Sequence, residues 1–133
     1  MNYEFGVFFM NQNKELKLDY SYDIDVDAMF INVVNDYVYD KSIEFEFGLI
    51  LDFDTEGIPV ALEMLDISQL FDSDRNFFNK IENIEMKIKI NCCISLDLKI
   101  YLLMGNKLVK YDLNKMAVNY LNSPKKTYLY SLK

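Results

Sequence analysis

Apolar and polar residues alternate along most of the chain, most clearly between Phe45 and Asp66. Two alternating runs flank the polar segment Asp54-Thr55-Glu56-Gly57, which is the pattern of a β-hairpin with one buried face. A four-residue loop sets Phe53 opposite Ile58, whereas a three-residue loop sets Phe53 opposite Pro59 and turns the apolar side chains outward. Because a one-residue slip moves a strand's side chains to the other face, the pattern predicts the four-residue loop. Its closing glycine is expected at a positive φ.

Alternating runs also predict strands before this hairpin. Tyr3–Phe9 and Leu16–Tyr22 form an expected hairpin around the turn Asn11–Lys14. In Ala28–Val34 nearly every position is apolar, which is typical of a strand covered on both faces.

The glycine at position 48 leaves two interpretations open. The alternation from Ile43 to Phe53 is compatible with one strand, but such a strand would be long for a globular protein. Alternatively, Glu46-Phe47-Gly48 is a three-residue loop that pairs Phe45 with Leu49 and Ile43 with Leu51. We favour the hairpin.

The second half of the chain shows the same alternation. The turn Gly105-Asn106 predicts a hairpin that sets Leu102 opposite Val109. Apolar residues on one side of Lys115–Leu121 are compatible with a short helix that ends before a proline. The remaining expected strands are Ile84–Ile90, Ile94–Leu102 and Thr127–Leu132.

Between the two β segments the pattern changes. Asp72-Ser73-Asp74 offers helix caps, and one or two short helices are expected within 67–81. The expected fold is therefore mainly β with minor α, built of antiparallel meander hairpins. We expect one domain over 1–133, with β segments at 18–68 and 82–133.

Three motifs occur in a specific order in the first β segment. An Asp-rich approach leads into a strand at Tyr22–Ile31, the strand Gly48–Asp54 ends in acidic residues, and an acidic turn with glycine precedes Glu63–Ser68. With these motifs, residues 18–68 resemble the small β family catalogued as domain of unknown function 2283. The resemblance implies an antiparallel β fold and carries no established activity.

Composition narrows the classes of function. The net charge of −7 argues against binding to nucleic acids or anionic membranes, since both use a concentrated basic patch. Histidine is absent, which removes the commonest general base and metal ligand. The cysteines, Cys92 and Cys93, are adjacent and form no CxxC motif, so we expect reduced thiols, one inward and one outward. No signal peptide or membrane span is recognised, and a cytoplasmic location is expected.

One stretch resembles a calcium-binding loop. Asp52, Asp54 and Glu56 alternate before a glycine, and Glu63 follows near the position of the closing bidentate glutamate. However, the flanking segments have the period of strands, and a hairpin carries Glu63 far along the next strand. Because a hard cation needs convergent oxygen ligands, we expect no calcium site and no other metal or cofactor site.

Other polar residues offer little evidence of catalysis. Asp23, Asp25 and Asp27 are interpreted as a solvated, turn-forming approach to a strand. The possible nucleophiles have no histidine to activate them. These are Ser21, Ser68, Cys92 and Cys93.

The high apolar content suggests a surface for association. Apolar residues make up 51% of the chain, more than a domain of this size readily buries. We therefore expect a non-enzymatic protein-interaction or self-associating module, most simply a two-fold dimer. The alternatives are an acidic divalent-cation-binding protein and an acidic partner that masks a basic protein surface.

Overall fold

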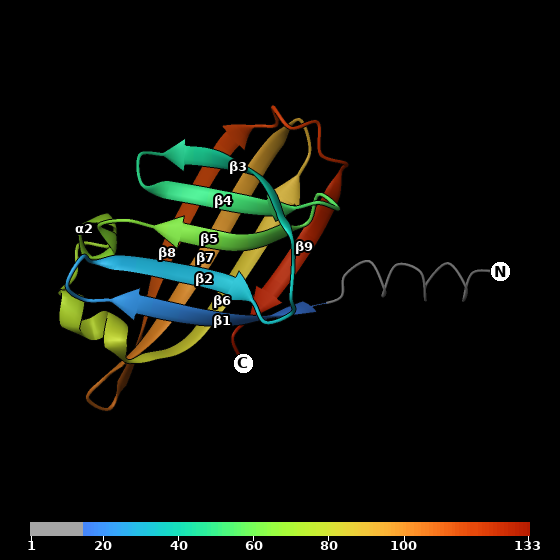
Figure 1. The fold of residues 1–133 in the computed structure, drawn as a ribbon. Helices are drawn as coiled ribbons and strands as arrows, with labels where there is room; N and C mark the ends of the chain where they lie inside the picture. The colour runs from blue at the N-terminus through green and yellow to red at the C-terminus, as the bar shows by residue number, and fades with distance from the viewer. Residues whose placement is uncertain (1–14) are drawn as a thin grey trace.

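The computed structural model describes residues 15–133, so the strand expected at Tyr3–Phe9 lies outside the described residues. The described chain consists mainly of strands, with two short helical segments between β5 and β6 (Figure 1). The strands are β1 (Glu15–Asp23), β2 (Ala28–Val33), β3 (Tyr39–Glu46), β4 (Leu49–Asp54), β5 (Pro59–Met64), β6 (Ile81–Ile90), β7 (Cys93–Met104), β8 (Lys107–Val118) and β9 (Lys126–Ser131). The helical segments are α2 (Ile67–Leu70) and the 3-10 helix η1 (Arg75–Asn79).

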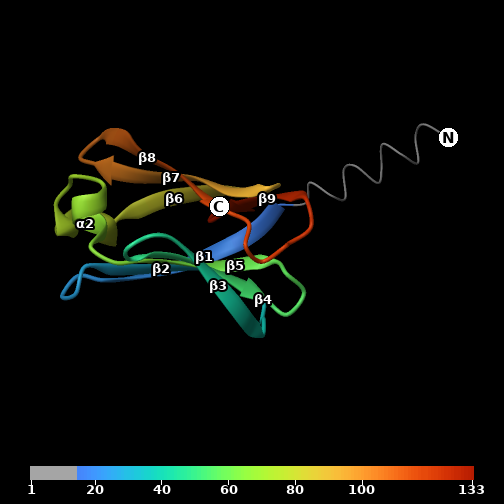
Figure 2. The same ribbon diagram turned by 90° about the horizontal axis from the view of Figure 1, so that it is seen from above.

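All nine of these strands belong to one sheet, in the order β3-β4-β5-β2-β1-β9-β6-β7-β8. Neighbouring strands are antiparallel except β1 and β9, which are parallel. This parallel pair joins the two β segments, and the sheet curls so that they face each other as two layers (Figure 2). The predicted mainly-β fold is confirmed, and the sheet is mixed because the C-terminal strand returns beside the first described one.

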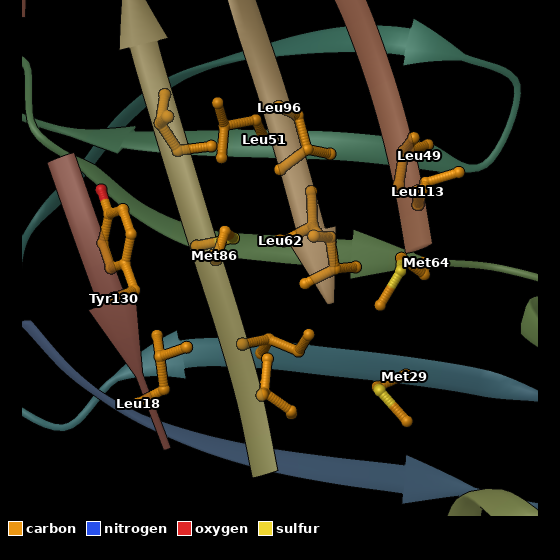
Figure 3. Close-up of a cluster of buried hydrophobic side chains, with 14 of the residues drawn as sticks. Leu18, Met29, Leu49, Leu51, Leu62, Met64, Met86, Leu96, Leu113 and Tyr130 are labelled. Atoms are coloured by element: carbon orange, nitrogen blue, oxygen red, sulfur yellow. The ribbon is translucent and has the colours of Figure 1, made fainter. Parts of the chain in front are cut away.

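The hydrophobic core lies between the two layers, whose strands cross (Figure 3). Along most of the length of the strands every second side chain points into this space, which is why the alternating pattern predicted the strands. In β2 only alternate residues are buried, so the expected burial of both faces of Ala28–Val34 is wrong. Core residues from the first layer include Leu18, Met29, Leu51 and Leu62, and those from the second include Met86, Leu96, Leu113 and Tyr130.

The β4–β5 hairpin differs from its predicted register. The Asp54 amide donates to the Ile58 carbonyl at 2.9 Å, and Phe53 lies opposite Pro59, so the loop has the three-residue form. The register then shifts, which leaves Val60 as an extra residue on β5. This β-bulge returns the following apolar side chains to the buried face. The prediction of a four-residue loop is wrong because alternation alone does not detect an inserted residue.

The turn glycine has the expected conformation, with φ +80° at Gly57. A Cβ added at Gly57 would meet no atom within 4 Å, so a substitution there introduces only backbone strain. We expect Gly57→Val to lower the free energy of unfolding by roughly 1–2 kcal/mol in denaturant titrations. Gly48→Ala should cost more, because Gly48 also has a positive φ and its added Cβ would lie 3.1 Å from the Leu65 Cβ. An unfolding midpoint unchanged by Gly57→Val would contradict the strain argument.

The β3–β4 segment is a hairpin, as favoured, and Ile43 lies opposite Leu51 as predicted. Leu49, however, pairs with Glu46 and not with Phe45. The register shifts around Phe45, and the turn is formed by Phe47 and Gly48. Here again a β-bulge makes the observed pairing differ from the pairing that simple alternation predicts.

The helical segments are partly as expected. Within 67–81, α2 and η1 form, and the Asp74 carboxylate caps η1 by accepting from the Asn76 amide. The helix expected at Lys115–Leu121 is wrong, because β8 continues to Val118 along the full length of β7. Neither helical segment, nor any other helix within residues 15–133, has the length and apolarity to cross a membrane.

The cysteines differ from expectation in their orientation. Cys92 is exposed in the β6–β7 turn, and Cys93 begins β7 and is half-buried. Both are free thiols. Neither points into the core, because the turn begins at Asn91 and takes Cys92 out of the strand alternation.

Candidate functional site

A surface pocket of about 580 Å³ lies where the β1–β2 turn meets the end of β5. Its lining includes a row of three residues from neighbouring strands, because Ser21 lies opposite Phe30 and Phe30 lies opposite Glu63. Strand alternation turns all three away from the core. A hydroxyl and a carboxyl group therefore flank an aromatic ring on the outer face of the first layer.

Glu63 shares its surroundings with a second carboxyl group. Asp52 on β4 pairs with Ala61, two positions before Glu63 on β5, so both carboxyl side chains lie on the same face. A hydrogen bond with Asp52, followed by burial and the charge of Asp52, raises the pKa of Glu63 from 4.5 to about 7. Asp52 is buried and also accepts a hydrogen bond from the Ser42 hydroxyl at 2.7 Å.

This carboxyl pair can carry a proton near neutral pH. Two close carboxyl groups do not ionise independently, and the second proton is held to a higher pH. Burial raises the pKa of the nearby Tyr37 hydroxyl, and the charges of Asp52 and Glu63 raise it further. Since a general acid or base works best when its pKa lies near the working pH, Glu63 is suited to proton transfer in the pocket.

A buried polar network lies beside the pocket and involves Asp27. The side chain of Asp27 is 0% exposed, and its carboxylate accepts from the Ser68 hydroxyl at 2.6 Å and the Tyr22 hydroxyl at 2.7 Å. The Ser68 amide also donates to it at 3.2 Å, and the Arg75 Nε lies 3.8 Å from it. The network ties the β1–β2 turn to α2 and η1.

The charge of Asp27 is stabilised within this network. Burial opposes its ionisation, but the hydrogen bonds from Ser68 and Tyr22 and the charge of Arg75 outweigh burial and lower its pKa. The expectation of a fully solvated acidic cluster is therefore wrong for Asp27. It holds for the turn itself, where the Asp25 amide donates to the Asp23 carboxylate at 3.0 Å.

The four residues of the calcium-like stretch are not used together. The Asp54 carboxylate accepts from the amides of Glu56 and Ile58, each at 2.9 Å, and so stabilises its own turn. Of these four residues, only Asp52 and Glu63 have side chains that interact. Glu63 is closer to Asp52 than expected, because the bulge shifts the pairing of β5. Within residues 15–133 no group of three or more acidic, histidine or cysteine side chains is arranged to hold a metal ion. That the stretch does not bind calcium stays a prediction.

In the sequence, Glu63 stood out as the closing glutamate of a calcium-like loop, and nothing there connected it with the pocket. Ser21 lines the pocket, whereas Ser68 is engaged by Asp27. Nothing in the alternation marked Phe30 as part of a site, since its partners come from other strands.

Comparison with known proteins identifies one relevant relative. A protein of Methanosarcina mazei named "Putative hypoxanthine phosphoribosyltransferase" is 30% identical to this chain over 114 residues, which cover 85% of this chain and 91% of the relative. No family model matches the chain, so the resemblance to domain of unknown function 2283 stays an expectation. No solved structure matches it either.

This relative overturns the expectation of a non-enzymatic interaction module, because it bears the name of an enzyme. Histidine is absent and no residue pattern marks a carboxylate base, yet a carboxyl pair formed between two strands raises the pKa of Glu63 into the range in which histidine normally acts.

Proposed function

This chain belongs to the family of the Methanosarcina mazei protein, and from that membership we propose that it transfers a phosphoribosyl group to a purine base of the hypoxanthine type. The observation that carries the proposal is the 30% identity, which extends over most of both chains. The pocket beside the β1–β2 turn is the site that we propose for this reaction.

The pocket has the chemistry to bind a flat heteroaromatic base. Its volume of about 580 Å³ is within the usual range for small-molecule sites. The ring of Phe30 offers a surface for stacking, and aromatic rings prefer offset stacked arrangements. The Ser21 hydroxyl and the Glu63 carboxyl group flank that ring and are placed to hydrogen-bond the edges of the base.

We assign Glu63 the role of general base. In the proposed step, a ring nitrogen of hypoxanthine forms a bond to C1 of the ribose, and the bond between C1 and the pyrophosphate oxygen breaks. Pyrophosphate leaves with the electron pair, and the N–H proton of the base passes to the ionised Glu63. Asp52 acts through Glu63 by raising its pKa, so that this proton is both accepted and released near pH 7.

The phosphates of the donor require cations at this site. The lining of the pocket includes Asp23 and Glu63 and no basic side chain. The donor would therefore enter with Mg²⁺ on its phosphates, since this ion commonly binds through substrate phosphates and one or two carboxylates, and Asp23 is the pocket carboxylate to which no proton transfer is assigned. Arg75, which donates to the carbonyl of the pocket residue Ile24 at 3.1 Å, lies near the rim, but its charge already faces the carboxylate of Asp27.

The test is an assay of the full chain with hypoxanthine, 5-phosphoribosyl 1-pyrophosphate and Mg²⁺, in which inosine monophosphate is measured by chromatography. We expect kcat/KM to rise with pH through about 7, as Glu63 loses its proton. Glu63→Gln should lower kcat by about 10²-fold or more and abolish that rise.

Glu56→Gln is the matched control, because it removes the same charge from an exposed turn outside the pocket. Failure of the wild-type chain to form a nucleotide at any pH would refute the proposed activity. Nucleotide formation that Glu63→Gln leaves unchanged would refute the proposed site.

We also propose a cytoplasmic location, supported by the free thiols of Cys92 and Cys93, which are typical of a reducing compartment.

A further inference from the structure

Ser42 belongs to a chain of hydrogen bonds that crosses three strands of the first layer and ends at the pocket. On β3, Ser42 lies directly opposite Asp52 of β4, and its hydroxyl donates to the Asp52 carboxylate at 2.7 Å. Asp52 shares a further hydrogen bond with Glu63 on β5. Of these three residues, Glu63 is the one that lines the pocket.

The direction of these hydrogen bonds follows from the number of protons available. A serine hydroxyl has one proton, which Ser42 donates to Asp52, so the Tyr39 hydroxyl at 2.6 Å must donate to the Ser42 oxygen. The register with β4 shifts between Tyr39 and Lys41, and the extra residue in β3 allows this contact. Donors that follow one another in this way polarise each other and strengthen the bond to the carboxylate.

The Ser42 hydroxyl favours the ionised form of Asp52. Asp52 is only 6% exposed, and within residues 15–133 no lysine or arginine forms an ion pair with it. A donated hydrogen bond stabilises a carboxylate more than a neutral carboxylic acid. Ser42 therefore provides the stabilisation that a cation would otherwise give to this buried charge.

We infer that Ser42 is a positioning residue, which keeps Asp52 ionised and thereby leaves the proton shared by the two carboxyl groups on Glu63. Two ionised carboxylates are both acceptors, so a hydrogen bond between them requires one proton. Because Asp52 is the stabilised anion, that proton belongs to Glu63, the member of the pair that faces the pocket. The meaning of this arrangement for catalysis rests on the proposed function, in which Glu63 accepts and releases a proton.

The other titratable groups on this face do not compete for the shared proton. Burial, followed by the charges of Asp52 and Glu63, raises the pKa of the Tyr37 hydroxyl above its ordinary value of 10, so Tyr37 stays protonated while the pair titrates. The remaining acidic side chains of the outer face lie on β1 and β3, each separated from β5 by another strand: Asp19, Asp23 and Glu44. None of them lies directly opposite either member of the pair.

The test is an NMR titration of the side-chain carboxyl carbons in the full chain, which needs no substrate. In the wild type, the Glu63 signal should titrate near pH 7. In Ser42→Ala the shared proton should move to Asp52, so Glu63 should ionise at a pH lower by about one unit or more. Ser42→Thr keeps the hydroxyl and should restore the wild-type midpoint.

A purely structural role of Ser42 would lower the stability of Ser42→Ala and leave the titration of Glu63 unchanged, which would overturn the inference. A Ser42→Thr variant that titrates like Ser42→Ala would also overturn it. Tyr39→Phe removes only an exposed hydroxyl and leaves the contact between Ser42 and Asp52 in place. Its midpoint should shift in the same direction by a smaller amount, and an unchanged midpoint would contradict the chain of hydrogen bonds.

The nucleotide assay separates this inference from the proposed function. In Ser42→Ala, the rise of kcat/KM with pH should move to lower pH by as much as the Glu63 midpoint moves. A shifted midpoint in a chain that forms no nucleotide would support the role of Ser42 and refute the proposed activity. An active chain whose Glu63 midpoint does not respond to Ser42→Ala would refute the role of Ser42 alone.

Discussion

Replacing Phe78 by alanine is expected to lower the free energy of unfolding by about 3–5 kcal/mol. Phe78 is the fully buried side chain of η1, at 0% exposure. Its ring centroid lies 5.7 Å from that of Tyr22 on β1 and 6.2 Å from that of Tyr111 on β8. The ring therefore joins strands of both layers, and its removal leaves a cavity that neighbouring strands cannot close by moving independently.

The neighbouring Phe77 provides the control. It has the same side chain in the same helical segment, but it is 40% exposed. We expect Phe77→Ala to cost less than about 1 kcal/mol in the same guanidinium titration, because much of its surface is already hydrated. Similar losses for the two variants would mean that η1 contributes through its backbone and not through the ring of Phe78.

Replacing Asp27 by alanine is expected to lower the free energy of unfolding by roughly 3 kcal/mol. The substitution leaves the Ser68 hydroxyl, the Ser68 amide and the Tyr22 hydroxyl without their acceptor. Unpaired groups of this kind are costly when buried. Asp25→Ala is the control, because the exposed Asp25 side chain lies in the same turn and only the backbone carbonyl of Asp25 contacts Arg75.

The Asp27 network also predicts a dependence of stability on pH. Folding lowers the pKa of Asp27 below its ordinary value of 3.8. The unfolded state therefore binds the proton first, and the contribution of Asp27 is present above that value and lost as the pH falls through the folded-state pKa. Asp27→Ala should flatten the acid limb of the stability profile. An acid limb identical to that of the wild type would show that other carboxylates account for it.

Local patterns were sufficient to identify the strands and most turns. Hairpin strands are close in sequence, and alternation of apolar side chains follows directly from burial of one strand face. The turn at Gly105-Asn106 set the pairing of Leu102 with Val109 correctly, because a two-residue turn leaves no freedom of register. The same reasoning failed at Val60 and Phe45, where the insertion of one residue changes the register without changing composition.

The candidate site could not be predicted from local patterns of apolar and polar residues. Phe30 and Glu63 are directly opposite each other, although thirty-three positions apart in the chain, because β5 inserts between β4 and β2. The pKa of Glu63 depends on Asp52, which the bulge brings near it. Neither the pairing of Phe30 with Glu63 nor the effect of Asp52 on the pKa of Glu63 can be predicted from the spacing of these residues in the sequence.

A mainly β protein with a helical interruption near residues 67–81 could be predicted from the alternating pattern, since burial of one strand face imposes a period of two on the side chains. The three-dimensional arrangement was needed to show that β9 joins the two β segments beside β1, that Asp27 is buried and not solvated, and that β3 and β8 form the edges of the sheet. The reason is physical: strand order and the burial of a charge depend on residues distant in the chain, whose contacts are set by how the whole sheet curls.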